Sequence, residues 1–232
     1  MSYVRLKHTL SAIALEALTE PGPSLAASAL AAYARRSVEA ESRDGRANGA
    51  AVPANVLALD IGAASDAVSR ALVGTGLFAS DGAGRIAVSA PYRPHAAYLR
   101  RQALRLEDAL RLAARPAPAD VPNAIRRGAA LFNSGLFFEC HEFFEDVWRA
   151  TGPPERTFYH GLVQAAAGCY HAEKGNAHGA AVLLDKARDK LAAYAPRYLG
   201  VDVAGLLASL GPVRNGASRG PYHGPRPAIQ LE

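Results

Sequence analysis

The sequence pattern predicts helix for almost all of residues 123–194, and the breaks between the helical segments are very short. The apolar spacing predicts helices over roughly 123–134, 137–150, 155–174 and 177–194. Gly135, the Gly152-Pro153-Pro154 run and Gly175-Asn176 separate them. Connections of this length make sequential helices antiparallel neighbours, so we expect a helical domain with repeat-like packing.

A proline-rich segment marks the boundary before these helices. Residues 115–122, RPAPADVP, contain three prolines, which block a continuous helix and indicate a linker. The sequence thus predicts an N-terminal domain at 1–115, a linker at 116–122, a helical domain at 123–211 and a Gly/Pro/Arg-rich tail at 212–232. For the tail we expect an extended or partly disordered segment, and the alternative that residues 225–231 lie along the helical core stays open.

The first domain has a less uniform pattern. We expect helices at 6–18, 24–38 and 63–75, with a polar loop at 41–54 between the second and the third. A hairpin should follow, because Leu77-Phe78 and Ile86 to Val88 flank the turn residues Asp81-Gly82. Helices followed by a two-stranded wing are typical of a winged helix. The fold class is therefore mainly α, with a winged-helix-like module before the helical domain.

The charge pattern permits a partner for residues 1–115 without requiring one. The net charge is +5, and the excess lies outside the helical domain. The helix before the expected wing offers one Arg and one Asp, which is little for phosphate contact. DNA binding, a protein partner, and a degenerate winged helix used for packing or dimerisation therefore all remain open. The Ala-rich helices could also form a homodimer.

Composition limits the class of protein and its location. Half of the 232 residues are hydrophobic, yet no stretch approaches the roughly 20 apolar residues of a membrane-spanning helix. The N-terminus has no apolar signal core. We expect a globular cytoplasmic protein without a membrane partner. The two cysteines, Cys140 and Cys169, exclude a disulfide scaffold and fit buried thiols.

Polar residues cluster in the second helix of the helical domain. On a helical wheel of residues 137–150 the large side chains share one sector, the core face: Phe137, Cys140, Phe144, Val147 and Trp148. At its edge His141 and Glu145 lie four residues apart, one turn above the other, with Glu142 a little further round.

The third helix repeats this arrangement. His160, Gln164, Ala167 and His171 recur at spacings of 4, 3 and 4 and form one stripe. If the two helices pack antiparallel, the polar stripes can face each other. Imidazoles, carboxylates and an amide would then meet in one seam.

Such a seam needs a compensating charge, because buried carboxylates that repel each other are costly. A divalent metal would supply it, and His with Glu suits Zn, Mn, Fe or Ni. The site could bind a divalent metal or a small polar ligand. We therefore take His141, Glu145 and His171 as candidate metal ligands, Glu142 and Glu145 as candidate catalytic residues for a hydrolysis, and Glu139, His160 and Gln164 as candidate binding residues. HEFFE lacks the second His of the zinc-protease motif, so that chemistry is not transferred.

A structural role for the same residues is the main alternative. Hydrogen bonds across the helix pair, with Arg126 or Arg127 neutralising the acids, could fix the helix register without any ligand. The protein would then be a non-catalytic regulatory or scaffold protein that binds DNA or a protein through residues 1–115.

Taken together, these positions resemble a helical family of bacteria and archaea, domain of unknown function family 309. The similar stretch is roughly residues 123–195, and its pattern comprises Phe132-Asn133, Phe138-Glu139, His141-Glu142, Glu145, Trp148, Gly161-Leu162, Gln164, Ala166, His171 and Gly175-Asn176. The resemblance implies an all-helical fold and brings no activity with it.

Overall fold

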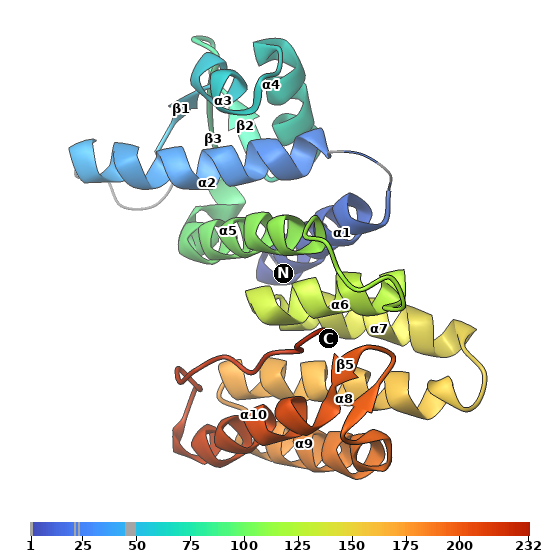
Figure 1. Ribbon diagram of the computed structural model, residues 1–232. Helices are drawn as coiled ribbons and strands as arrows, with labels where there is room; N and C mark the ends of the chain where they lie inside the picture. The colour runs from blue at the N-terminus through green and yellow to red at the C-terminus, as the bar shows by residue number, and fades with distance from the viewer. Residues whose placement is uncertain (1, 21, 23, 45–49) are drawn as a thin grey trace. The chain divides into compact units, whose positions relative to one another are not determined.

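The computed structural model describes residues 2–20, 22, 24–44 and 50–232, with side chains from all of these except 40–44. As expected, the described chain is mainly α (Figure 1). It divides into two compact units, Met1–Leu110 and Arg111–Glu232. Residues 45–49 of the expected polar loop lie outside the described residues.

The first unit combines helices with a small sheet. Its elements are α1 (Ser2–Thr19), α2 (Leu25–Asp44), β1 (Val52–Pro53), α3 (Ala54–Ile61), α4 (Ser65–Gly74), β2 (Phe78–Ser80), β3 (Arg85–Val88), the 3-10 helix η1 (Ala90–His95) and α5 (Ala96–Ala113), whose last turn enters the second unit. The helices differ from the expected pattern in two places, because α2 extends six residues further than expected and α3 follows the expected loop, where no helix was expected.

The sheet of this unit is antiparallel, with strand order β1-β3-β2. Val52 pairs with Ile86, and Phe78 pairs with Val88. The expected hairpin is present, but its turn is longer than the two residues predicted. Asp81 Oδ1 accepts hydrogen bonds from the backbone N–H groups of residues 83 and 85, and Gly84 adopts φ +70°, which glycine tolerates best.

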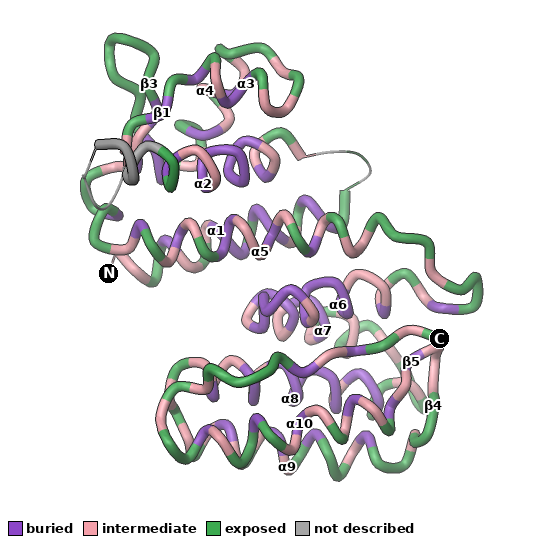
Figure 2. The backbone as a smooth tube through the Cα atoms, turned by 60° about the vertical axis from the view of Figure 1, so that its left-hand side comes forward, coloured by how far each residue is buried: buried purple, intermediate pink, exposed green. Residues whose placement is uncertain are grey.

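The second unit is built from helices and one small hairpin. Its elements are α6 (Asn123–Ser134), α7 (Phe137–Ala150), α8 (Glu155–Glu173), α9 (Ala177–Leu191), η2 (Ala192–Tyr194), β4 (Arg197–Tyr198), β5 (Val201–Asp202), α10 (Val203–Gly216) and η3 (Ala217–Arg219). The four predicted helices are confirmed within a few residues. Buried positions crowd α6, α7 and α8, whereas α9 and α10 alternate between buried and exposed positions (Figure 2).

Two glycines allow α8 and α9 to pack closely. A Cβ added at Gly161 would lie 2.7 Å from the side chain of Leu191, and one added at Gly168 would lie 2.7 Å from that of Leu184. The two glycines are seven residues apart on α8, and the two leucines are seven residues apart on α9, so the contact repeats after two turns along one antiparallel interface. Leu184 and Leu191 are buried there. This interface fixes the register of α8, which carries part of the candidate site.

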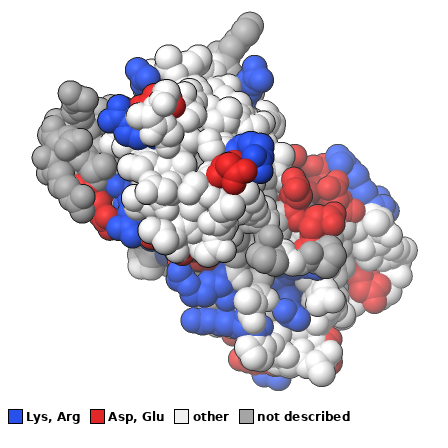
Figure 3. Space-filling model, turned by 90° about the horizontal axis from the view of Figure 1, so that it is seen from above, with Lys and Arg blue, Asp and Glu red and all other residues white. Residues whose placement is uncertain are grey.

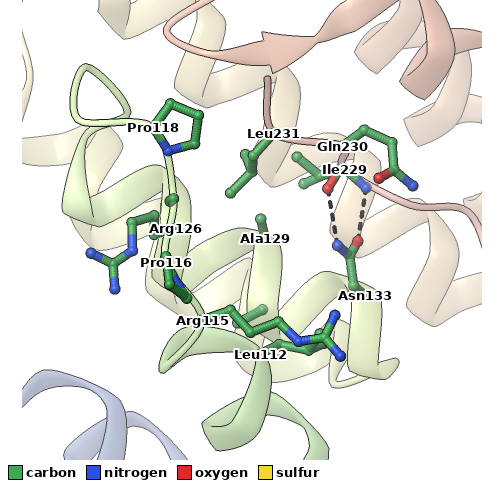
Figure 4. Close-up of a pocket in the computed structure, with 12 residues that line it drawn as sticks. Leu112, Arg115, Pro116, Pro118, Arg126, Ala129, Asn133, Ile229, Gln230 and Leu231 are labelled. Carbon is green, nitrogen blue, oxygen red and sulfur yellow. Dashed lines mark hydrogen bonds between the residues drawn. The ribbon is translucent and has the colours of Figure 1, made fainter.

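The C-terminal segment differs from the expected tail. Helix α10 runs to Gly216 with Pro212 inside it, beyond the expected boundary at 211. The last residues lie along the helical core, which was the alternative left open. Ile229 is 2% exposed. Its backbone N–H donates to Oδ1 of Asn133 at 2.7 Å, and its carbonyl oxygen accepts from Nδ2 of Asn133 at 2.9 Å (Figure 4).

None of the helices in the described part of the chain is both long and apolar enough to cross a bilayer.

Candidate functional site

Helix α7 separates apolar from polar side chains largely as the wheel predicts. Phe137, Cys140 and Phe144 are buried, at 6%, 0% and 0% exposure. Val147 and Trp148, predicted to share this core face, are only half-buried. A Cβ at Gly128 of α6 would lie 2.0 Å from the ring of Phe144, so α6 packs directly on the apolar face. The opposite edge of α7 is left for polar groups.

That edge brings together His141, Glu142 and Glu145. One potential ligand atom from each lies within 4.8 Å of the other two, and all three side chains are partly exposed, at 28%, 39% and 25%. In the described residues this is the one group of three or more His, Cys, Asp or Glu side chains with such geometry. A His/Glu/Glu group of this kind could hold a metal ion.

The two glutamates already have partners. Nδ1 of His141 lies 3.0 Å from Oε1 of Glu142, and Arg149 donates to Oε1 of Glu145 at 2.7 Å. The Arg149 side chain is 62% exposed, so this ion pair contributes little and can be exchanged for another cation. A carboxylate only accepts hydrogen bonds, so the neutral His141 ring carries its proton on Nδ1 and keeps a lone pair on Nε2.

His171 is held in the opposite tautomer. Oδ1 of Asn176 accepts from the backbone N–H of Gly179 at 2.9 Å, which caps α9 and orients the amide. The amide nitrogen of Asn176 then faces Nδ1 of His171 at 2.8 Å. Because that nitrogen can only donate, Nδ1 of His171 accepts and its proton resides on Nε2.

The predicted ligand set of His141, Glu145 and His171 is therefore not brought together, and Glu142 stands in the place of His171. Antiparallel packing explains this. Rings of α7 and α8 meet in two pairs, Phe138 with Tyr170 at 5.5 Å and Trp148 with His160 at 4.6 Å. That register places Glu145 about eight residues, roughly 12 Å along the axis, from the level of His171.

His141 and His171 nevertheless share a cavity between α7 and α8. It has a volume of about 160 Å³ and is lined by Phe138, His141, Ala167, Tyr170 and His171. The rings of Phe138 and Tyr170 are tilted by 49° to each other, and Lys174 lies over the Tyr170 ring at 5.5 Å. The small side chain of Ala167 leaves this space open. No acidic residue lines the cavity.

The other predicted binding residues lie at the opposite end of the helix pair. His160 stacks on Trp148 with an interplanar angle of 26°, and its Nε2 lies 3.2 Å from the amide nitrogen of Gln164. Arg156 lies over the Trp148 ring. Burial lowers the pKa of His160, and the positive charges of Lys190 and two other basic side chains lower it further. The expected single seam is thus two separate sites.

Glu139 and the two cysteines are in the interior. Glu139 is 1% exposed, so it does not reach the surface on which His141 lies. Burial raises the pKa of both thiols, which keeps them protonated. Cys140 donates weakly to the carbonyl oxygen of Gly128 at 3.4 Å. The thiols act as small apolar groups.

Sequence reasoning did not select Phe138, Tyr170, Ala167 or Asn176 for the site. The signal for Asn176 was present, because Gly-Asn before a helical segment is typical of an N-cap. Its bond to the preceding histidine has no sequence pattern of its own. The aromatic walls could be found only once the helix register was known.

A second cavity, of about 220 Å³, lies between the linker and the C-terminal segment, with α6 as its floor (Figure 4). Two of its four polar side chains already have structural partners. Asn133 binds the Ile229 peptide, and Arg126 donates to the carbonyl oxygen of Ala113 at 2.9 Å while its guanidinium points away from Leu231. We therefore take the His141 site as the candidate.

Comparison with curated proteins found no match, and comparison with solved structures found none either. A family model does match part of the second unit, from α6 into α9, and it includes the residues of the cavity and of the His/Glu/Glu group. The family model that matches, at residues 125–183, is described as "Domain of unknown function (DUF309)".

Proposed function

We propose that α7 binds a divalent metal ion through His141, Glu142 and Glu145, in a site that supports hydrolysis. The observation that carries the proposal is the clustering of one imidazole nitrogen and two carboxylate oxygens within 4.8 Å. Metal bonds of about 2.0–2.2 Å bring ligand atoms to roughly 3–4 Å of one another. Nδ1 of His141 and Oε1 of Glu142 are already 3.0 Å apart, so a metal would take the place of the Nδ1 proton, and only a small movement of Glu145 is needed.

The ligand chemistry supports Zn, Mn, Fe or Ni. One borderline nitrogen and two hard oxygens suit these ions, and three protein ligands leave a coordination position open. A metal held there would polarise a substrate oxygen or lower the pKa of a bound water. The oxygen of Glu142 or Glu145 that is not bound to the metal would then act as general base.

Metal titration of the full chain tests this proposal. Calorimetric titration with ZnCl₂ and with MnCl₂, using protein prepared without chelator, should show one site. His141→Ala and Glu145→Ala should weaken binding at least about tenfold, because each removes one of three ligands, while helix content by circular dichroism is retained.

Asp146→Ala is the matched control. This residue is on the same helix, carries the same charge as Glu145 and is 78% exposed, but it is not part of the group. Its affinity should remain within about twofold of the parent. Equal affinity in all four proteins, or no binding at millimolar metal, would overturn the proposal and favour a purely structural network.

For the first unit we infer a second function, binding of a protein partner. The order of its elements, α2-β1-α3-α4-β2-β3, supports the winged-helix interpretation. Two of its basic residues near the hairpin are neutralised, since Arg70 pairs with Asp66 at 2.7 Å and Arg85 pairs with Asp81 at 2.8 Å. In Figure 3 several blue groups lie directly beside red ones on a largely white surface. This favours protein over DNA.

Mobility shifts with the full chain and a random duplex would test that inference. We expect only weak binding at low salt, with little dependence on the salt concentration, because Arg70 and Arg85 are already paired with aspartates. Asp66→Asn and Asp81→Asn together free both arginines and should increase duplex binding. Tight, salt-sensitive binding by the parent chain would contradict the inference.

A further inference from the structure

The cavity between α7 and α8 presents two histidines whose ring nitrogens have opposite hydrogen-bonding roles. Glu142 accepts from Nδ1 of His141, so Nε2 of that ring is an acceptor. Asn176 donates to Nδ1 of His171, so Nε2 of that ring is a donor. Both rings line the same cavity, and neither Nε2 is hydrogen-bonded to any group in the described part of the chain.

The orientation of His171 is fixed from both sides of Asn176. A Cβ at Gly179 would lie 2.7 Å from Nδ1 of His171, so the Nδ1 edge of the ring faces the first turn of α9. The cap bond from Gly179 to Asn176 prevents the amide from turning over. His171 is therefore set as an N–H donor before any ligand arrives, which avoids an ordering cost on binding.

The remaining walls define the shape of a ligand. Phe138 and Tyr170 supply two rings that contact each other, with centroids 5.5 Å apart, and the small side chain of Ala167 leaves space beside them. A cavity of roughly 150 Å³ holds one benzene ring, and this one has about 160 Å³. The lining contains no carboxylate, and the ammonium group of Lys174 already lies over the Tyr170 ring, so the cavity favours a neutral ligand over a second cation.

We propose that this cavity binds a small neutral aromatic amide, whose carbonyl oxygen accepts from Nε2 of His171 and whose N–H donates to Nε2 of His141. An aromatic carboxylate offers two acceptors and no donor, so one of its oxygens would face the lone pair of His141 and be repelled by it. The cavity therefore favours the amide over the carboxylate. The inference goes beyond the proposed function and concerns the metal-free site, because a metal on Nδ1 of His141 would move the ring proton to Nε2. It names the class of molecule that the metal-free site accepts.

The tautomers can be measured without a ligand. Long-range ¹H–¹⁵N correlation spectra of histidine-labelled full chain distinguish the two neutral forms of each ring. We expect the Nδ1–H form for His141 and the Nε2–H form for His171, assigned by their loss in His141→Gln and His171→Gln. The Nδ1–H form for His171 would overturn the proposal.

Benzamide is the binding probe, with benzoate and N,N-dimethylbenzamide as analogues that lack the donor. In titrations monitored by NMR, benzamide should bind at least about tenfold more tightly than either analogue, because each leaves the His141 nitrogen unsatisfied. Equal binding of all three, or no binding of benzamide, would overturn the proposal.

Asn176→Asp is the decisive variant. Aspartate retains the N-cap of α9 but presents an acceptor to Nδ1 of His171, so the ring proton should move to Nδ1 and leave Nε2 as an acceptor. Benzamide affinity should fall at least about tenfold while the helix content is retained. Ala167→Leu is the control for space: it should abolish benzamide binding and leave both tautomers unchanged.

Failure of this proposal can be told from failure of metal binding. Glu145 does not line the cavity, so Glu145→Ala should lose the metal and still bind benzamide. Benzamide binding without any metal site would refute the proposed function alone. A metal site together with unselective aromatic binding would refute the inference alone.

Discussion

Gly168→Ala tests the helix interface on which the cavity depends. In the structure a methyl group at this position would lie 2.7 Å from both Cγ and Cδ2 of Leu184 and 3.2 Å from the backbone nitrogen of the same residue. Carbon atoms pack best at about 3.5–4.0 Å, so the leucine would have to retreat by roughly 1 Å. It is 3% exposed and has little room to do so.

Two opposing effects set the expected size of the change. Overpacking a well-filled interface costs about 1–3 kcal/mol, whereas alanine favours a helix over glycine by about 1 kcal/mol. The backbone contact prevents relief by side-chain rotation alone, which places the clash toward the upper end. We expect Gly168→Ala to lower the free energy of unfolding by about 1–2 kcal/mol.

Denaturant unfolding of a double-mutant cycle with Leu184→Ala isolates the clash. The leucine truncation alone should cost about 2–5 kcal/mol, because it leaves a cavity beside Gly168. In the double variant the added methyl fills part of that cavity, so the double variant should be more stable than the two single changes predict, by at least about 1 kcal/mol. Strict additivity, or a stabilised Gly168→Ala protein, would refute this account of the interface.

Two further predictions concern other parts of the second unit. Asn133→Ala should lower the free energy of unfolding by about 1–3 kcal/mol and speed proteolysis of the C-terminal segment, because both polar groups of the buried Ile229 peptide lose their partner, whereas Asn123→Ala on the exposed start of α6 should change neither. The pKa of His160 is lower in the folded chain than in the unfolded chain. Below about pH 6.5 the unfolded chain therefore binds more protons than the folded chain, and the free energy of unfolding decreases as the pH is lowered. Denaturation at pH 7.5 and 5.0 should show a smaller fall for His160→Gln, and an identical fall would refute the role of this residue.

Helices α6 to α9 could be predicted because local signals and global packing agree. Glycine at residue 135, the Gly-Pro-Pro break and Gly175-Asn176 each end or begin a helix, and an amphipathic pattern fills the spaces between them. α3 and α10 were missed for the opposite reason. α3 has eight residues, too few to show a clear period, and α10 contains Gly211-Pro212, which locally indicates a break although tertiary packing keeps the helix intact.

The candidate site was predicted in part, since a helical wheel gives the angle of a side chain but not its partner on another helix. His141 and Glu145 were placed on the correct edge of α7. His171 was placed on the correct helix. The register of α7 against α8, however, depends on contacts between the helices such as that of Trp148 with His160, and no sequence pattern predicts these contacts. One stripe of polar residues was therefore expected where the structure has two sites.

The hydrogen-bonding role of each imidazole is set by the neighbouring side chain that contacts its Nδ1 atom. His141 and His171 are the same residue type on neighbouring helices, yet a carboxylate faces Nδ1 of one and an amide nitrogen faces Nδ1 of the other. These neighbours give the two rings opposite roles toward the cavity they share. Spacing rules that treat every histidine as an equivalent ligand cannot separate them. The side chain that orients each ring must be identified before a histidine is counted as a metal ligand.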